Sequence, residues 1–289
     1  MKVLILGSDG MIGHKIAQSL NDDCELILSS RKSISLDTIG VKRGKILLHD
    51  LITDNLDSML KKIFPDLIIN CAGITTRRGV EDNIVNTELL NSDLPHKLDS
   101  WANLNSKKLI HFSTDCIFSG NRGNYLDNDF ADADDIYGKS KALGEVDSPN
   151  TLTLRCSMIG RELYNFTELF EWLKKNKNTK IEGYSNTFYS GITTVRMGII
   201  LNQILKKNLN LSGIYNISST PISKFDLLIK LSNVFNLNVE VKQNTNNKSN
   251  KVLISEKFTE ITGIYPPNWD DLISEFKEDC NKYKGLYKN

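Results

Sequence analysis

Tyr137 and Lys141 are the two residues whose types and spacing most directly suggest chemistry. They lie four positions apart, so on a helix both side chains would project from one face, one turn from each other. A tyrosine with a pKa of about 10 is a poor acid at neutral pH, and a nearby ammonium lowers that pKa by stabilising the phenolate. Such a pair can protonate a carbonyl oxygen while a hydride reaches the carbonyl carbon. The same spacing is common on helix surfaces, so its meaning depends on the surrounding elements.

A further hydrogen-bond donor to the carbonyl is expected where a strand ends before this helix. The segment from His111 to Phe118 reads His-Phe-Ser-Thr-Asp-Cys-Ile-Phe. We expect Thr114 to supply the donor, and Ser113 is the alternative.

A glycine turn near the start of the chain indicates where a cofactor would bind. It lies between an apolar run at residues 2–6 and a helical pattern at residues 11–20. Gly7 allows the tight turn, Gly10 lets the backbone approach a pyrophosphate, and Gly13 lets the helix pack on the strand. The helix N-terminus presents free N–H groups to the phosphates. The predicted cofactor contacts in this turn are Gly7, Asp9, Gly10, Met11, Ile12 and Gly13.

The end of the second predicted strand bears on the choice of cofactor. It carries no acidic residue to hold ribose hydroxyls and reads Ser-Ser-Arg-Lys at residues 29–32. Arg31 can pair with a 2′-phosphate and Ser30 can hydrogen-bond it, which favours NADPH over NADH. The alternative is that Arg31 and Lys32 are solvated loop charges.

Later strand ends supply the other predicted cofactor contacts. Asp50 follows the third strand and either contacts the adenine amino group or caps the next helix. The contacts expected after the third and fourth strands are Asp50, Leu51, Cys71, Ala72 and Gly73.

The elements that position these residues alternate between strands and helices. Strands are predicted at residues 2–6, 25–29, 45–48, 66–72 and 108–113, and helices at 11–20, 55–63 and 87–104. This alternation predicts an α/β fold with a doubly wound, parallel Rossmann sheet. Residues 1–150 are expected to form the NAD(P)-binding domain. Residues 151–289 are expected to form mainly a smaller C-terminal α/β substrate-binding domain, with some segments returning to the sheet.

The second half is less regular. Strands are predicted at residues 151–155 and 213–217, and helices at 166–175 and 223–235. Residues 243–250 are polar and are predicted to form a surface loop. The segment at 266–269 is expected to begin a C-terminal helix. Arg155 is expected in a structural ion pair, and Trp172 in the core.

Composition narrows the class of protein. The 289 residues are 40% hydrophobic and 25% charged, with 36 Lys and Arg against 35 Asp and Glu. The net charge of +1 gives no overall field for nucleic acid or a membrane surface. No apolar stretch approaches the roughly 20 residues of a membrane span, and the first apolar run is too short for a signal peptide. The cysteine and histidine spacings predict reduced thiols, no metal site and a cytoplasmic protein.

Taken together, several motifs resemble the extended short-chain dehydrogenase/reductases. They are the glycine turn, Asn-Cys-Ala-Gly at 70–73, Ser-Thr-Asp-Cys-Ile-Phe at 113–118, Tyr-Gly-Lys-Ser-Lys at 137–141 and Gly-Glu at 144–145. The string at 113–118 is most similar to nucleotide-sugar reductases of the dTDP-4-dehydrorhamnose type. The resemblance implies that Thr114, Tyr137 and Lys141 carry catalysis, and that Asn91 keeps the central helix in place at the cofactor site. A sugar nucleotide would bind between the domains, at Thr75, Arg77, Thr114, Asp115 and Met158.

Two residues depart from that family pattern. Met158 stands where the rhamnose reductases often have an aromatic residue, which leaves the identity of the sugar open. Cys116 stands where many simple reductases have tyrosine, and it resembles the catalytic thiol of GDP-fucose synthases and plant-type epimerase/reductases. That thiol moves protons beside the ketone, with a pKa that a cationic neighbour would lower. The alternative is a small buried residue. A second acid or base would come from Arg161, Glu162 or a lysine near Lys174.

The resemblance implies NAD(P)H-dependent reduction of the 4-keto group of a nucleotide-linked 6-deoxy sugar, of the dTDP- or UDP-4-keto-rhamnose type, in deoxysugar or L-rhamnose biosynthesis. One alternative is a bifunctional 3,5-epimerase/4-reductase that uses Cys116. Another is a non-catalytic regulatory subunit, because such a subunit of methionine adenosyltransferase also resembles this family. A dehydratase is disfavoured, since Asp115-Cys116 replaces the usual Asp-Glu pair. The expected partner is the nucleotide sugar, and a homodimer is a further expectation.

Overall fold

The structure is a computed structural model that describes residues 1–20, 24–265 and 267–287. In this described part, seven parallel strands form one sheet in the order β11-β6-β5-β4-β1-β2-β3. The strands are β1 (Lys2–Leu6), β2 (Glu25–Ser30), β3 (Lys45–Leu48), β4 (Leu67–Asn70), β5 (Lys108–Ser113), β6 (Thr151–Arg155) and β11 (Gly213–Asn216). The strand order reverses between β1 and β4, which is where a doubly wound sheet opens a ligand crevice. The predicted Rossmann sheet is confirmed.

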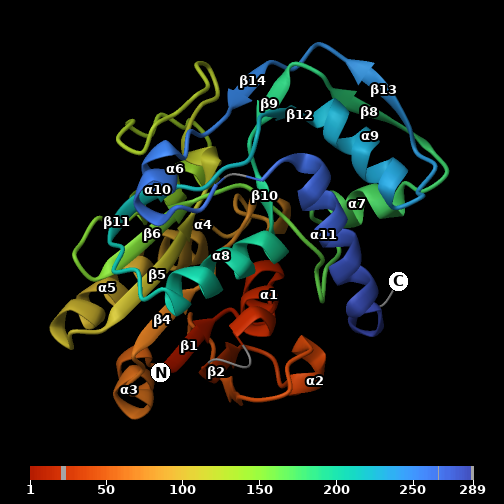
Figure 1. Cartoon of the computed structure of the whole chain (residues 1–289). Coiled ribbons are helices and arrows are strands. Elements are labelled where there is room, and N and C mark those ends of the chain that lie inside the picture. Colours follow the sequence, from red (N-terminus) through yellow and green to blue (C-terminus); the bar gives the residue numbers. More distant parts are fainter. Residues whose placement is uncertain (21–23, 266, 288–289) are drawn as a thin grey trace.

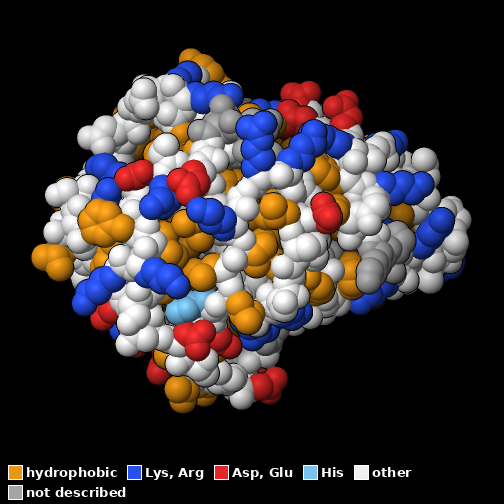
Figure 2. Space-filling model, turned by 90° about the horizontal axis from the view of Figure 1, so that it is seen from below, with side chains coloured by type: hydrophobic (Ala, Val, Ile, Leu, Met, Phe, Trp, Pro, Cys, Tyr) orange, Lys and Arg blue, Asp and Glu red, His pale blue; other side chains and the backbone are white. Residues whose placement is uncertain are grey.

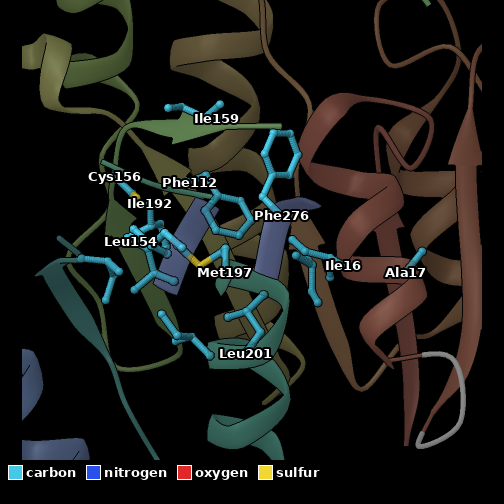
Figure 3. Close-up of a cluster of buried hydrophobic side chains, with 14 of the residues drawn as sticks. Ile16, Ala17, Phe112, Leu154, Cys156, Ile159, Ile192, Met197, Leu201 and Phe276 are labelled. Carbon is cyan, nitrogen blue, oxygen red and sulfur yellow. The ribbon is translucent and has the colours of Figure 1, made fainter. Parts of the chain in front are cut away.

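Helices cover both faces of the sheet (Figure 1). Along β1, Val3 and Ile5 pack into one core, whereas Leu4 and Leu6 pack into the other, as the two-residue period of a strand requires. The first core includes side chains of α1 (Met11–Leu20), α8 (Thr194–Lys206) and α11 (Trp269–Lys282). Figure 3 shows side chains of these helices close to those of β5 and β6. The second core includes side chains of α3 (Leu56–Ile63) and α5 (Leu94–Leu104).

The helix predicted at 87–104 contains an irregular turn. It begins earlier, with α4 (Ile84–Glu88), and passes through a π-helical turn at Leu89–Asp93 before α5. Pro95 lacks the N–H that would bond to the carbonyl of Asn91 four residues before it. Gly144 follows α6 (Ile136–Leu143) and packs against that carbonyl, and a Cβ there would overlap the oxygen. The π-helical turn and α6 therefore fit together closely.

The second half of the chain adds elements near the carboxyl ends of the sheet strands. The helices there are α7 (Leu169–Lys175) and α9 (Lys224–Val234). The added strands are β7 (Met158–Ile159), β8 (Lys180–Tyr184), β9 (Thr187–Tyr189), β10 (Ile192–Thr193), β12 (Ile222–Ser223), β13 (Glu240–Asn244) and β14 (Ser249–Lys251). Helix α7 starts later than predicted, after Asn165 and Phe166, whose φ values of 68° and 54° are left-handed.

The prediction of a surface loop at residues 243–250 is wrong at both of its ends. Residues 243–244 belong to β13, which pairs with β8, and residues 249–250 belong to β14, which pairs with β9. Residues 245–248 connect the two strands. The pairing partners come from a distant part of the chain, and such tertiary contacts override the low strand preference of Asn and Gln.

The C-terminal helix α11 contacts the first helix, α1. As expected, a helix starts just after Asn268, whose side chain accepts the Asp271 N–H; Pro266 lies outside the described residues. Lys15 of α1 and Asp279 of α11 form a salt bridge of 2.5 Å. The remaining helices of the described chain are α2 (Leu36–Ile39) and α10 (Glu256–Thr262).

Figure 2 shows positive and negative side chains interspersed on the face seen from below. Among the described residues, no helix is both long and apolar enough to cross a membrane. Each of the cysteines is a free thiol.

Candidate active site

A cavity of about 660 Å³ lies at the carboxyl ends of β1, β4 and β5 and is walled on its far side by α7, β8, β9 and α9. This is the position where ligands bind in doubly wound folds. The predicted cofactor contacts that line it are Met11, Ile12, Cys71, Ala72, Gly73 and Asn91. The predicted catalytic and substrate residues that line it are Thr75, Arg77, Thr114, Asp115, Cys116, Tyr137, Lys141 and Met158. Candidates that are far apart in the sequence are thus brought together around one space.

Tyr137 reaches this cavity because of how α6 begins. Asp135 caps the helix by accepting the Gly138 N–H at 2.8 Å, which fixes the first turn. A Cβ on Gly138 would overlap the carbonyl oxygen of Cys116, so glycine lets α6 approach the segment after β5. The Tyr137 hydroxyl consequently hydrogen-bonds to Thr114.

The two candidates for the additional donor have different partners. The Ser113 hydroxyl donates to Glu145 Oε1 at 2.6 Å, whereas the Thr114 hydroxyl lies next to Tyr137 and donates to Asp115 Oδ1 at 3.2 Å. Glu145 is itself held by Arg155 at 2.7 Å, which confirms the expected ion pair. This arrangement favours Thr114 over Ser113 as the residue that works with Tyr137.

Lys141 is buried one turn after Tyr137 on α6, and its ammonium reaches β5. Its ammonium donates to the Phe112 carbonyl at 2.6 Å and lies 3.4 Å from His111 Nε2. Burial lowers the pKa of Lys141 to about 8, although Glu145 opposes the shift. The cation therefore sits in a site that disfavours its charge.

The expected lowering of the Tyr137 pKa by Lys141 is not found. Burial raises the pKa of Tyr137, Cys116 adds to the increase, and the hydrogen bond with Thr114 opposes it. Desolvation of the phenolate is the largest effect, and the Lys141 ammonium, which donates to the Phe112 carbonyl, is not among the groups that lower the pKa of Tyr137. Tyr137 is therefore protonated at neutral pH, as a free tyrosine also is, and burial makes it a weaker acid than the spacing with Lys141 predicted.

His111 was not among the predicted site residues. Its ring is fully buried between Asn70 and Lys141, with Nδ1 3.2 Å from Asn70 Nδ2. Burial and then the Lys141 charge hold the pKa of His111 well below its usual range, so the ring is neutral. One feature of the sequence could have identified His111 as a site residue: it is a histidine inside an otherwise apolar strand, shortly before the Ser-Thr pair.

Asn91 ties the loop after β4 to the helix that carries Tyr137. Its side chain accepts the Ile74 N–H at 2.9 Å and donates to the Ile74 carbonyl at 2.9 Å and to Ser140 Oγ at 3.0 Å. It also lines the cavity. The contact with α6 matches the positioning role that the resemblance implied.

The glycine turn lies beside a second, smaller cavity of about 70 Å³. The residues around it include Asp9, Gly10, Met11, Arg31 and Lys32, and the facing loop at 162–165 closes it. Arg31 is therefore next to the glycine turn, as a role in 2′-phosphate binding requires.

The remaining predicted cofactor residues line neither of these two cavities in the described structure. Gly7 and Gly13 form the inside of the turn, where a Cβ on Gly13 would overlap the Gly7 carbonyl oxygen. The buried Ser30 hydroxyl accepts the Lys32 N–H at 3.0 Å, and Leu51 packs against the second core.

The alternative role of Asp50 as a helix cap is wrong. Asp50 Oδ1 accepts the Ile52 N–H at 2.9 Å in a local turn, and Asn55 caps α3 instead. The turn of residues 51–54 separates Asp50 from the helix start. Its contact with adenine stays a prediction.

Thr75 and Arg77 connect the first half of the chain to the segment before α7. Thr75 Oγ1 donates to Glu168 Oε1 at 3.1 Å, and Arg77 Nη1 donates to the Thr167 carbonyl at 2.7 Å. Trp172 is only half-buried: it packs against the first core, as expected, but it also lines the large cavity. These contacts place α7 at the cavity wall.

Cys116 does not have the lowered pKa that an acid-base role would favour. Burial raises the pKa of Cys116 to about 12, and Asp115 adds to the increase, although Lys251 and Lys224 oppose it. The cationic neighbours are present, but desolvation of the thiolate is the larger effect.

The expected sources of a second acid or base are not at the large cavity. Arg161 pairs with Glu171 at 2.5 Å, and Glu162 accepts the backbone N–H groups of Thr167 and Glu168. Neither they nor Lys174 is among the described residues around that cavity, whereas Lys224 is. Lys224 begins α9, and sequence reasoning missed it.

The parallel sheet, the glycine turn at its first strand end and the Thr114, Tyr137 and Lys141 set together define an extended short-chain dehydrogenase/reductase. Within that class the sequence matches one family over residues 1–281, and the chain belongs to it: the RmlD substrate binding domain family.

Individual relatives agree with this assignment. The dTDP-4-dehydrorhamnose reductase of Aggregatibacter actinomycetemcomitans is 27% identical over 245 residues, which cover 80% of this chain and 78% of that protein. A hypothetical dTDP-4-dehydrorhamnose reductase from Sulfolobus tokodaii has a similar crystal structure, with a TM-score of 0.77, 24% identity and coverage of 93% and 98%. The dTDP-4-dehydrorhamnose reductase from Bacillus anthracis, solved in complex with NADP, gives a TM-score of 0.78, 21% identity and coverage of 96% and 99%. At these identities the structural likeness establishes the fold.

Proposed function

We propose that this protein reduces the 4-keto group of a nucleotide-linked 6-deoxy sugar with NADPH, in deoxysugar or L-rhamnose biosynthesis. The observation that carries the proposal is that Thr114, Tyr137 and Lys141 meet on the wall of one cavity, which is large enough for both a nicotinamide and a sugar ring. The named relatives act on dTDP-4-dehydrorhamnose, which supports the same sugar class.

Each of the three candidate catalytic residues has its own role in the proposed reaction. Bound NADPH would supply the hydride. Thr114 orients the sugar carbonyl, and Tyr137 donates its hydroxyl proton to the carbonyl oxygen as that oxygen gains negative charge. Lys141 lies one turn further along α6, where its ammonium can hold the ribose of the cofactor and restore charge balance near the phenolate. Because burial raises the pKa of Tyr137, its hydroxyl is a weaker acid than an exposed tyrosine, and it gives up the proton only as negative charge develops on the carbonyl oxygen.

The preference for NADPH rests on the glycine turn's neighbours. Arg31 and Lys32 lie beside Asp9 and Gly10 around the small cavity. Ser30 precedes them at the end of β2. A 2′-phosphate there would gain charge-assisted hydrogen bonds that NADH lacks.

The test is product analysis by NMR in deuterated water. The protein is incubated with NADPH and either dTDP-4-keto-6-deoxyglucose or dTDP-4-keto-rhamnose, and the UDP forms are run in parallel. We expect NADPH consumption with a 4-keto sugar and loss of roughly a hundredfold or more in kcat for Tyr137→Phe, because the proton donor is removed. The matched control is Tyr265→Phe, which changes a tyrosine that is 78% exposed.

The same experiment separates the other functions. Deuterium at C3 and C5 that disappears in Cys116→Ala would mean an epimerase/reductase, which the raised pKa of Cys116 does not favour. If the protein binds NADPH but consumes it with none of these sugars, the reductase proposal is wrong, and the non-catalytic regulatory subunit becomes the function to test.

A further inference from the structure

Lys224 occupies an unfavourable place for a lysine that has only a structural role. It is the first residue of α9, directly after the Ser223 cap, where the helix dipole disfavours a positive charge. Its side chain lies in the large cavity, and burial lowers the pKa of Lys224. A buried lysine with these costs on the wall of a cavity is a candidate for ligand binding.

The ammonium of Lys224 is available to a ligand. It lies 3.5 Å from the centre of the Tyr189 ring. Among the described residues it forms neither a hydrogen bond nor a salt bridge, although Asp115 and Cys116 are close enough to raise its pKa. An ammonium has three N–H donors, and the lysine that carries this one lines the cavity.

Two other polar groups converge on the same end of the cavity. Asp115 is 4% exposed and accepts a hydrogen bond from its neighbour Thr114. Tyr189 is 2% exposed, and its hydroxyl has no hydrogen-bond partner within the described chain. A buried polar group without a partner is costly, so a bound ligand that supplies one would be stabilised.

The Asp115 carboxylate is close to the carbonyl site, because its Oδ1 accepts the Thr114 hydroxyl at 3.2 Å. Asp115 is the residue next to Thr114, which orients the carbonyl in the function proposed above. On a sugar ring the substituent next to the carbonyl is correspondingly close to the carbonyl oxygen. We propose that Lys224 and Asp115 together bind the hydroxyl group on the ring carbon adjacent to the one that is reduced.

This inference rests on the proposed reductase function and narrows its substrate class. The ammonium of Lys224 donates to the hydroxyl oxygen, and that hydroxyl donates its own proton to the Asp115 carboxylate. Both hydrogen bonds are charge-assisted, which makes them stronger than neutral ones. Lys224 thereby selects a 4-keto sugar that retains its C3 hydroxyl group over one that lacks it.

The test compares two substrates on the same nucleotide, a 4-keto-6-deoxyhexose and its 3-deoxy counterpart. For the wild type we expect kcat/KM to favour the hydroxylated sugar by roughly ten- to a hundredfold, the range for hydrogen bonds to charged groups. In Lys224→Met this preference should fall to a few-fold at most. The matched control is Lys251→Met, which removes another cation acting on Cys116 but lies outside the described cavity lining.

Thermal unfolding distinguishes ligand binding from a structural role. Because Lys224 carries a desolvated charge at a helix N-terminus, Lys224→Met should have a Tm equal to or above that of the wild type. A lowered Tm, or an unchanged sugar preference in Lys224→Met, would overturn the inference while leaving the reductase in place. If the wild type reduces neither sugar, the proposed function fails, and the inference fails with it.

Discussion

At the scale of single residues, burial decides the acid-base properties of the site. Tyr137 keeps its proton and Lys141 is close to losing its own, because both charged forms are poorly solvated. The residues themselves were identified from the sequence, since their spacing and the preceding strand end are local features. The direction of the Tyr137 shift was not predictable, because it depends on how deeply α6 lies in the molecule.

The lowered pKa of Lys141 leads to a prediction about pH. Its ammonium is present below the pKa of about 8 and is lost as the pH rises through that value. If the ammonium holds the cofactor, kcat/KM for NADPH should fall above about pH 8, because this parameter reports the free enzyme. Stopped-flow or initial-rate measurements between neutral and alkaline pH would record the profile.

The control for this pH profile is Lys141→Arg, which keeps its charge throughout the range. Any activity that remains in this variant should lack the alkaline fall, and its NADPH binding should be pH-independent. A fall that persists unchanged in Lys141→Arg would assign the titration to another group.

At the scale of elements, the site depends on the fit between the π-helical turn and α6. Asn91 of that turn bonds to the loop after β4 and to Ser140 of α6. The Asn91 carbonyl, left without its usual helical partner by Pro95, lies against Gly144. A small change at this contact would move the helix that carries Tyr137 and Lys141.

We predict that Gly144→Ala destabilises the protein. The new methyl group would overlap the Asn91 carbonyl oxygen, and overpacking of this kind costs about 1–3 kcal/mol. Urea unfolding gives the change in free energy, and kcat should fall because α6 shifts. In the control, Gly285→Ala, the methyl group meets nothing within 4 Å, so the free energy should change by less than about 0.5 kcal/mol. Equal stability of the two variants would contradict this account.

At the scale of the whole molecule, α11 is bonded to α1 and stabilises its position. Lys15 of α1 is 4% exposed and bonds to both carboxylate oxygens of Asp279 on α11. His14 Nε2 lies 3.0 Å from the Tyr287 hydroxyl, and His14 Nδ1 lies 2.7 Å from the Gly10 carbonyl oxygen. The end of the described chain therefore supports the helix that follows the glycine turn.

We predict that Asp279→Asn costs about 3 kcal/mol, because it leaves the buried Lys15 ammonium without its counter-charge. Denaturant unfolding would show this as a lowered midpoint. Asp270→Asn on the same helix is the matched control. It breaks a pair whose side chains are 39% and 81% exposed, so the expected change is within about 1 kcal/mol. A similar small effect at Asp279 would show that the Lys15 contact contributes little.

Several features of the fold were predictable because they are local. Val3 and Ile5 alternate with Leu4 and Leu6, and such periodicity identifies a strand without knowledge of its neighbours. Residues 243–250 show the opposite case, since their strands exist only through pairing with β8 and β9. Lys224 was missed for a similar reason. A lysine at a helix start looks like a surface residue until the cavity around it is known.

The sequence by itself determined the class of fold, the glycine turn and the Thr114, Tyr137 and Lys141 set, because each depends on spacing within a short segment. Only the tertiary structure decided which way pKa values shift, which residues of the second half meet Cys116, and how the two ends of the described chain support each other. Desolvation and long-range contacts cause these effects, and both arise when distant segments pack together.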